Sequence, residues 1–464
     1  MLPVIAILGR PNVGKSTLFN RMIGERKALV DDRPGVTRDR NYGVARVHDR
    51  EVIVIDTGGL EPDPHDDLFV AIRRQAEAAL AEADLVLFVV DRQTGLTPPD
   101  KVAADLLRRW ISAHKGDGGA GKIMLLVNKC DGHKHDEEAA EFWSLGIEPM
   151  MCISAEHGRN IYDLYDEIVP RLPPAVEGAG ADDQDGEIRV AVVGRPNIGK
   201  STLVNRLLGE ERQVVHDSPG TTTDAVDSVI TVDGQVLRIV DTAGVRRKAR
   251  VSKEDDRVEA FAVARAIKTI ERCHISLLMI DGVEGVTGQD AKLAQLISER
   301  GRAAIIVVNR WDLVVKMPER NSGTIEDEVR HRLPHLDWAP VLFISAKTGK
   351  GCAHLVPLVR EVFDAFNQRI PTSPLNRFLE AALEANAPPQ RYHHPVRMNY
   401  MTQHRVRPPS FIVWCNTPDG VAEPYRRYLE NKLRATFGFR GAPIKIEIRK
   451  KRKPGEAKAG DEEG

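Results

Sequence analysis

Short apolar runs alternate along most of the chain with longer segments in which apolar residues recur at helical spacing. In the first part of the chain the runs are VIAILG, EVIVID, DLVLFVVD and KIMLLVN, and LFVAIRRQAEAAL has the helical spacing. The same alternation returns with RVAVVG, VLRIVD, ISLLMID and AAIIVVN. Strands that are apolar on both faces are typical of a mainly parallel sheet covered by helices. The pattern therefore predicts two α/β domains.

The pattern changes after Pro371. The spacing there predicts a helix over 375–384, strands over 396–401 and 411–416, a helix over 424–437 and a strand over 444–449. This αββαβ order predicts a small α+β domain. The closing residues contain nothing apolar larger than alanine, and we expect them to form a disordered tail.

Both α/β segments carry one glycine-rich sequence. GRPNVGKSTLFNR begins at Gly9 and GRPNIGKSTLVNR at Gly194. Each matches G-x-x-x-x-G-K-[ST], in which backbone N–H groups surround phosphates, a lysine reaches the terminal phosphates and a hydroxyl holds Mg²⁺. One match alone could be a structural turn, but the separation between the two loops also relates Asp56 to Asp241. A duplicated domain keeps such a register, so we predict two nucleotide sites per chain.

The length and the linker composition define the domains. A chain of 464 residues suggests about three domains. PPAVEGAGADDQDGE, between the repeats, has five acidic residues and no basic one, which is typical of a flexible linker. The expected organisation is a first α/β domain at 1–172, a linker at 173–187, a second α/β domain at 188–370, the α+β domain at 371–453 and a tail at 454–464.

Charge is distributed unevenly. The net charge is −1, yet residues 377–453 contain 16 lysines and arginines against 6 acidic residues. This basic module on an acidic body indicates a polyanionic partner, although a solvated charged face is the alternative.

The cysteines and the N-terminal residues indicate the cellular compartment of the protein. Five cysteines lie far apart without metal-ligand spacing, which suits a reducing compartment. The apolar start is too short for a membrane span and leads into the glycine-rich loop, so we expect a buried strand there. We therefore expect a cytoplasmic protein, and a monomer.

A second motif identifies the base. NKCD at 128–131 and NRWD at 309–312 each follow an apolar strand. The carboxylates of Asp131 and Asp312 can accept hydrogen bonds from N1–H and N2–H₂ of guanine, and adenine offers no such pair of donors. Arg310 stands where the first copy has Lys129, and its charge and stem can still lie over a base. SAEHG at Ser154 and SAKTG at Ser345 follow each motif.

A third set of residues is suited to sense the γ-phosphate. Asp56 in DTGG and Asp241 in DTAG end strands and can hold Mg²⁺ through water, while the following glycines can turn an N–H toward the γ-phosphate. Thr37 and Thr222 can complete the Mg²⁺ shell only when a third phosphate is present, so order on GTP and release on hydrolysis follow.

These predictions make up one set of candidate residues. The catalytic candidates are Lys15, Thr37, Gly59, Lys200, Thr222 and Gly244. The nucleotide-binding candidates are Gly9, Asn12, Gly14, Lys15, Ser16, Thr17, Asp56, Asn128, Lys129, Asp131, Ser154, Ala155, Gly194, Asn197, Gly199, Lys200, Ser201, Thr202, Asp241, Asn309, Arg310, Asp312, Ser345 and Ala346. The Mg²⁺ candidates are Ser16, Thr37, Asp56, Ser201, Thr222 and Asp241.

Together these motifs resemble the Era-like branch of the translation-factor-related GTPases. The tandem pair followed by a basic αββαβ module is similar to the bacterial double-Era-like GTPases, over residues 2 to about 450. QRYHHPVRMNYMTQ, PPSFIVWCN, YRRYLENKLRATFGFRGAPIKI and RKKRK carry the likeness in the module. The resemblance implies two tandem Ras-like P-loop GTPase domains, a KH-like α+β domain, and a switch in maturation of the large ribosomal subunit that contacts rRNA.

The resemblance also implies an unusual catalytic arrangement. Ras-like enzymes carry a water-orienting glutamine where this chain has Leu60 and Val245. The resemblance implies instead that Asn12 and Asn197 help to hold a K⁺ ion beside the β- and γ-phosphates. Alternatively, these asparagines only cap the loop.

The module offers several candidate RNA contacts. GFRG at 438–441 matches the loop with which KH domains clamp a nucleic-acid backbone, but Gly438 can instead end the preceding helix. Tyr400 and Trp414 are either stacking or core residues. The candidate phosphate contacts are Arg397, Arg405, Arg407, Arg426, Arg427 and the run 449–453, with VRRKARVSK as a further basic segment.

Two other functions remain open from the sequence. One is a GTPase of tRNA modification or membrane remodelling, against which the missing catalytic-cysteine motif and lipid anchor count. The other is an interaction protein whose second domain only senses nucleotide, as Arg310 hints. The sequence does not reveal which domain turns over faster, or which rRNA or ribosomal protein is contacted.

Overall fold

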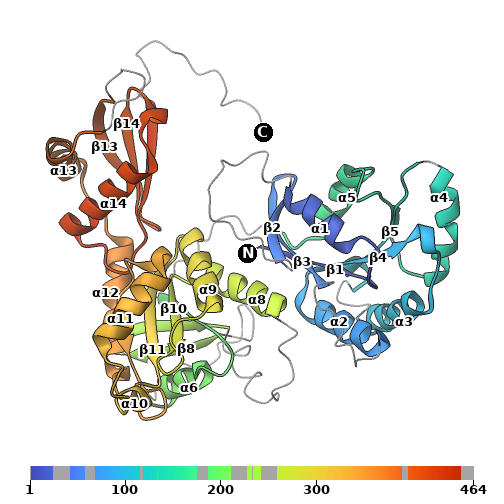
Figure 1. The fold of residues 1–464 in the computed structure, drawn as a ribbon, viewed down its shortest axis with the longest axis horizontal. Helices are drawn as coiled ribbons and strands as arrows, with labels where there is room; N and C mark the ends of the chain where they lie inside the picture. Colours follow the sequence, from blue (N-terminus) through green and yellow to red (C-terminus); the bar gives the residue numbers. More distant parts are fainter. Residues whose placement is uncertain are drawn as a thin grey trace. The chain divides into compact units, whose positions relative to one another are not determined.

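Three β-sheets organise the chain (Figure 1). The structure is a computed structural model that describes residues 2–24, 42–57, 68–114, 119–132, 134–174, 187–210, 227–232, 234–241, 259–388 and 396–450. The first sheet lies in one compact unit, and the other two sheets share a second unit. Each unit is described by itself.

The first sheet has six strands in the order β2-β3-β1-β4-β5-β6. All neighbouring pairs are parallel except β2 and β3. The strands are β1 (Val4–Leu8), β2 (Tyr42–Val47), β3 (Arg50–Asp56), β4 (Leu85–Asp91), β5 (Ile123–Asn128) and β6 (Met150–Cys152). Because β1, β4 and β5 are buried along their whole length, they are the near-continuous apolar runs seen in the sequence.

Helices cover both faces of this sheet. Figure 1 shows α1 and α5 on one face and α2 and α3 on the other. The first pair shares a core with the strands, in which Phe19, Met22 and Tyr165 are buried. The helices are α1 (Lys15–Gly24), α2 (Leu68–Glu82), α3 (Pro98–Ala113), α4 (Lys134–Glu138) and α5 (Ile161–Ile168).

The second sheet repeats the first, strand for strand. Its order is β12-β11-β10-β7-β9-β8, and only the pair of β8 and β9 is antiparallel. The strands are β7 (Glu187–Val193), β8 (Ser228–Val232), β9 (Gln235–Val240), β10 (Ile275–Asp281), β11 (Ala303–Asn309) and β12 (Val341–Phe343). The helices are α6 (Lys200–Glu210), α8 (Glu259–Arg272), α9 (Gly288–Glu299), α10 (Trp311–Val314), α11 (Ser322–Arg332) and α12 (Leu355–Asn367).

The third sheet has three strands, with β14 between β13 and β15. Helices α13 and α14 pack against it (Figure 1). The elements are α13 (Thr372–Ala385), β13 (Met398–Arg405), β14 (Ser410–Cys415), α14 (Glu423–Phe437) and β15 (Lys445–Lys450). The predicted αββαβ order is confirmed, with element ends shifted by a few residues.

The C-terminal module packs closely on the second α/β domain. The two share one hydrophobic core that runs from β7 to β15. Backbone bonds cross between them, because Ala304 N donates to Gly441 O at 2.9 Å and Gly441 N donates to Trp338 O at 3.2 Å. The Arg434 guanidinium lies 5.7 Å from the centroid of the Trp338 ring. The two modules therefore form one packed body.

Several expectations lie outside the described residues. These are the tail at 454–464, most of the linker, and the basic segment VRRKARVSK. Glu187, placed at the end of the linker by the sequence, is the first residue of β7. Within the described ranges, no helix combines the length and the apolar composition needed to cross a membrane.

Candidate functional site

The two glycine-rich loops have nearly the same backbone. Gly14 and Gly199 have φ values of 95° and 99°, and Asn12 and Asn197 have values of 66° and 61°. Glycine adopts positive φ without steric cost, and asparagine does so more readily than most other residues. A Cβ on Gly14 would lie 2.2 Å from Asn128 Nδ2. Each loop therefore needs its second glycine both for its conformation and for the close approach of the next motif.

The asparagine of each base motif joins three segments. Asn128 Nδ2 donates to Val13 O at 2.8 Å, and Asn128 Oδ1 accepts from Ala155 N at 2.9 Å. In the second domain, Asn309 makes the same two bonds, to Ile198 O at 2.7 Å and from Ala346 N at 2.9 Å. Both asparagines are buried. The phosphate loop, the N-x-x-D motif and the S-A motif are thus held together in both domains.

The loop lysines lie over their own loops. Lys15 Nζ donates to Arg10 O at 2.7 Å, and Lys200 Nζ donates to Gly194 O at 2.7 Å and to Arg195 O. Only 5 % of Lys15 is exposed, and burial lowers its pKa to about 8, although Asp56 acts in the opposite direction. An anionic ligand here would favour the charged form of Lys15 and so raise this pKa.

This lowered pKa predicts a pH dependence of nucleotide binding. Binding of phosphate favours protonated Lys15, so the free protein takes up a proton on binding when the pH exceeds about 8. First-site affinity should then fall by up to about tenfold per unit between roughly pH 8 and 9. A titration in the Lys200→Ala chain measures this slope, and Lys15→Arg should flatten it, because arginine stays charged. Equal slopes for lysine and arginine would contradict the assignment.

The candidate Mg²⁺ residues differ between the two sites. Ser16 Oγ donates to Asp56 Oδ2 at 2.6 Å, so this pair lies close enough to share one ion. Asp241 has a left-handed φ of 59°, and its Oδ2 accepts from Thr269 Oγ1 at 3.3 Å. A hydroxyl and a carboxylate are hard oxygen ligands of the kind Mg²⁺ prefers. The first site fits the ion as it stands, whereas in the second site the carboxylate is held by α8.

Neighbouring polar groups orient the side chains of the base motif in the first site. Asp131 is exposed, and its Oδ1 accepts from Ser154 Oγ at 2.7 Å. Lys129, with a φ of 66°, forms an ion pair of 2.6 Å with the buried Asp91. The Asp131 carboxylate is therefore oriented and accessible to a base.

The guanidinium group of Arg310 makes one more contact than the ammonium group of Lys129. Its Nη1 lies 2.7 Å from Asp281 Oδ2, which corresponds to the pair of Lys129 and Asp91. Its Nη2 also donates to Asn197 O at 2.8 Å, in the phosphate loop. The replacement of lysine by arginine thus keeps the ion pair and adds a tie to the loop.

Sequence reasoning missed several groups that hold the site, and each occurs in both domains. Aspartates at the ends of β4 and β10 pair with Lys129 and Arg310, and the signal was the final D of FVVD and LMID. The first arginine of each loop contacts a buried aspartate in a T-x-x-D capping box, and the arginine that ends each quoted repeat binds the carbonyl of the S-A motif. The pairs are Arg10 with Asp100 (3.4 Å), Arg195 with Asp290 (3.3 Å), Arg21 with Ala155 (2.5 Å) and Arg206 with Ala346 (2.7 Å).

Some predicted site residues lie outside the described residues. They are Thr37, Gly59, Thr222 and Gly244, together with Leu60 and Val245. Thr17 and Thr202 are exposed on the first turns of α1 and α6. Gly9 and Gly194 begin the two loops, and a Cβ on Gly9 would lie 2.3 Å from Val89 O.

The C-terminal module presents aromatic and basic groups in one row. Tyr400 pairs in register with Trp414, which pairs with Arg449. The two rings are stacked, with centroids 5.8 Å apart. Both aromatic residues are half-buried and Arg449 is exposed. This row offers a stacking surface beside a cation.

Two other candidate RNA contacts of the module, Arg407 and the GFRG loop, instead take part in packing within the protein. Arg407 donates to Asn367 Oδ1 and lies 5.5 Å from the ring centroid of Phe363. Gly438 follows α14 with a φ of 96°, and Gly441 bonds to the second domain. The GFRG loop therefore ends the helix and joins the domains, which leaves little of its backbone for a clamp.

Models of known protein families match three parts of the chain. The family described as "50S ribosome-binding GTPase" matches residues 4–129 and 189–310, and "KH-domain-like of EngA bacterial GTPase enzymes, C-terminal" matches 369–449. "Elongation factor Tu GTP binding domain" matches 260–371. "GTPase Der" of Geobacter sp. (strain M21) is 44% identical over 450 residues, covering 97% of this chain and 98% of that protein. "GTPase Der" of Syntrophotalea carbinolica is 44% identical over 453 residues, covering 97% and 99%.

Solved structures are similar to parts of the chain as well. Era in complex with MgGDPNP and nucleotides 1506–1542 of 16S ribosomal RNA matches 58% of this chain and 94% of that chain, at 24% identity and a TM-score of 0.30.

Proposed function

Because this chain belongs to the GTPase Der family, we propose that it is a GTP-hydrolysing switch with two nucleotide sites that acts in assembly of the large ribosomal subunit. One observation supports the two nucleotide sites of this proposal. Asn128 and Asn309 each tie a phosphate loop to a guanine-type N-x-x-D motif and an S-A motif through the same two hydrogen bonds. Two complete frameworks of this kind support two guanine-nucleotide sites.

Each group has a separate role in this proposal. Lys15 and Lys200 bind the β- and γ-phosphates, and Asp131 and Asp312 accept from the guanine edge. Ser16 and Asp56 would hold Mg²⁺, which neutralises charge on the phosphates when bound. Ser201 and Asp241 would do so in the second site after the Asp241 carboxylate turns from Thr269. We assign Thr37, Thr222, Gly59 and Gly244 to the sensing of the γ-phosphate.

A potassium ion completes the proposed catalytic site. Asn12 and Asn197 are exposed, with left-handed backbones at the same point of each loop. An amide oxygen there is a hard ligand suited to a monovalent cation, which would supply the positive charge that an arginine finger supplies in other GTPases.

Turnover should therefore depend on K⁺. We expect GTP hydrolysis to fall at least about tenfold when Na⁺ replaces K⁺, since a single positive charge at the transferred phosphoryl group has a larger effect than this in related enzymes. Asn12→Ala should remove the K⁺ response of the first site while nucleotide still binds, and Asn197→Ala should do so in the second. Equal rates of GTP hydrolysis in K⁺ and in Na⁺ would contradict the proposed potassium site.

The basic module is the proposed ribosomal anchor. The stacked pair of Tyr400 and Trp414 beside Arg449 supports RNA binding, because bases stack on aromatic rings while arginine contacts phosphate. Arg397, Arg405 and Arg427 are also exposed in this module. We place the protein in the cytoplasm as a monomer that contacts rRNA of the large subunit.

Sedimentation with purified large ribosomal subunits tests this anchor. We expect association that differs between a GTP analogue and GDP and that weakens steeply with salt, because each phosphate contact adds about −0.7 to −0.9 to the log–log slope. Arg427→Gln with Arg449→Gln should make the slope shallower by about 1.4 to 1.8. Arg108→Gln with Arg109→Gln, exposed on α3 of the first domain, is the matched control. Binding that ignores salt, or an equal loss in the control, would mean that the module is not the anchor.

A further inference from the structure

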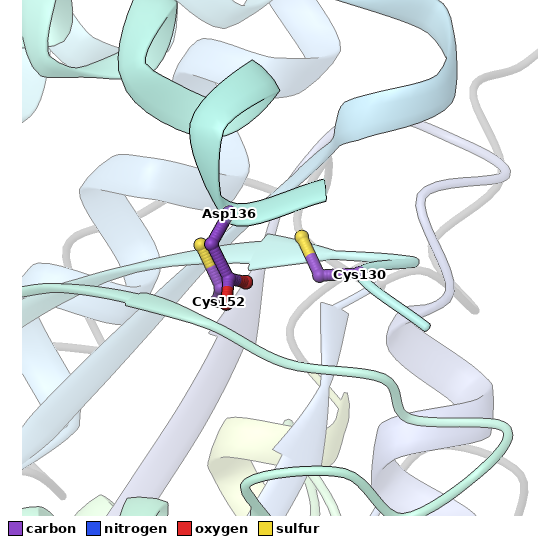
Figure 2. Close-up of side chains that lie close together, drawn as sticks. All are labelled: Cys130, Asp136 and Cys152. Carbon is purple, nitrogen blue, oxygen red and sulfur yellow. The ribbon is translucent and has the colours of Figure 1, made fainter. Parts of the chain in front are cut away.

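Two cysteines lie together beside the base motif of the first site. Cys130 is the third residue of NKCD, and Cys152 ends β6. Figure 2 shows their side chains converging with that of Asp136 from α4. The two sulfurs and a carboxylate oxygen of Asp136 lie within 4.8 Å of one another. The two backbones are also adjacent, since Cys130 N donates to Ile153 O at 3.0 Å.

The second domain has no thiols at these positions. Trp311 is the third residue of NRWD, and Phe343 ends β12. Their rings are in contact, with centroids 4.6 Å apart. The same place in the two domains therefore holds an inert aromatic contact in one and a pair of thiols in the other.

We propose that Cys130 and Cys152 are a redox site, which a hydroperoxide oxidises to a disulfide next to the base pocket of the first domain. The consequence for nucleotide binding rests on the proposed function of that pocket. The thiol chemistry itself does not.

The environments of the two sulfurs assign their roles. Cys152 is half-buried, whereas Cys130 is fully buried. The nearby Cys130 thiol lowers the pKa of Cys152, burial and the Asp136 carboxylate act in the opposite direction, and the Arg159 guanidinium acts with Cys130. The nearby Cys152 sulfur and burial raise the pKa of Cys130, whose thiol donates to Val127 O at 3.4 Å. The accessible sulfur is therefore the better thiolate, and the buried sulfur remains a thiol.

The reaction balances with one hydroperoxide. The Cys152 thiolate attacks the terminal peroxide oxygen and the O–O bond breaks, so that the sulfur gains an OH group. Hydroxide leaves from hydrogen peroxide, or alkoxide from an alkyl hydroperoxide, and takes up the proton that the Cys152 thiol lost, giving water or alcohol. The Cys130 sulfur then attacks this sulfenic sulfur, the S–OH bond breaks, and the thiol proton leaves with the hydroxyl as water. Two thiols lose two electrons in total, and the peroxide gains them. A dithiol reductant reverses the change by exchange.

A metal is a weaker candidate for this cluster. Arg159 makes two bonds to Asp136, at 2.9 and 2.6 Å, and also donates to Cys130 O at 2.9 Å. Its cation already neutralises the carboxylate that a metal would need. The two sulfurs without Asp136 leave an incomplete ligand set for Zn²⁺, which usually takes four ligands.

A disulfide here would couple directly to base recognition. Cys130 precedes Asp131, and Ser154, which bonds to Asp131, lies two residues after Cys152. A disulfide needs an S–S distance of about 2.05 Å, so its formation draws these two segments together. We expect the resulting shift of the Asp131 carboxylate to weaken guanine-nucleotide binding.

The test treats the full-length chain with one equivalent of hydrogen peroxide, blocks remaining thiols with an alkylating agent and maps peptides by mass spectrometry. We expect a Cys130–Cys152 disulfide that a dithiol reductant removes. Free, alkylated Cys130 and Cys152 after this treatment would overturn the proposal.

The coupling is measured separately. In the Lys200→Ala chain, first-site affinity for GDP should fall about fivefold or more on oxidation, the lower end of usual couplings between sites, and Cys152→Ser should abolish the effect. In the Lys15→Ala chain, second-site affinity should not change, because Trp311 and Phe343 cannot be linked. An unchanged first-site affinity with the disulfide present would overturn the coupling. Failure of the untreated first site to bind GDP would refute the proposed function but leave the thiol result standing.

Discussion

The Lys15→Ala chain is expected to hydrolyse GTP at its first site at least about 100-fold more slowly than the unaltered chain, which corresponds to about 2.7 kcal/mol of the activation barrier. Lys15 is almost fully buried over the phosphate loop. The other cation of this loop, Arg10, is turned toward Asp100 and Thr94, so it does not take the place of Lys15. Lys200→Ala should have the matching effect in the second site.

Stoichiometry separates this result from a general loss of activity. Native mass spectrometry should find two guanine nucleotides per unaltered chain, one for each single variant and none for the double variant. Lys101→Ala, which removes an exposed lysine from α3, should keep both nucleotides and full turnover. If either single variant retained two nucleotides and normal turnover, the loop in question would not be a catalytic site.

Asp131→Asn should convert the first site from guanosine to xanthosine nucleotides, and Asp312→Asn should do the same for the second. The carboxylate accepts from two donors of guanine, whereas an amide can instead donate to the carbonyl that xanthine carries in place of the amine. Hydrogen bonds to a charged group contribute roughly 1.5–3 kcal/mol each. Loss of GTP affinity by about 100-fold, with a gain for XTP, is therefore expected from titrations with both nucleotides.

Ser154→Ala is the matched control for this switch. It removes the 2.7 Å bond that orients Asp131 but leaves the carboxylate in place. It should weaken GTP and XTP binding alike and leave the preference for guanine unchanged. Normal GTP hydrolysis by the site that carries the asparagine would show that the base assignment there is wrong.

The sequence predicted the fold class because its signals are local. An apolar run, a glycine-rich turn and a strand that ends in N-x-x-D are each read within a few residues, and their duplication makes a chance match improbable. The phosphate loop, the N-x-x-D motif and the S-A motif meet because parallel strands bring their carboxyl ends to one edge of the sheet. The pairing of Asn128 with Val13 and Ala155 follows from that topology.

The sequence could not predict side-chain partners that depend on packing. The final D of FVVD marks Asp91 as a polar strand end, but it does not show that the partner is Lys129, which follows the neighbouring strand β5. Asp241 was matched to Asp56 by position, yet its backbone turns left-handed and its carboxylate contacts Thr269. Arg407 was considered as an RNA contact from its charge, whereas it packs on Phe363. Each outcome depends on residues far apart in sequence.

The core shared by the second GTPase domain and the basic module has a thermodynamic consequence. The hydrophobic pattern changes near residue 371, but one continuous core extends from β7 through β15, with backbone bonds from Gly441 to Ala304 and Trp338. Elements joined in this way unfold as one cooperative unit. A truncation at the apparent boundary would expose the apolar face of the remaining domain to water, and such a fragment would aggregate before it could report on binding. Point substitutions on the exposed face are therefore the sound way to separate the module's contribution from that of the GTPase.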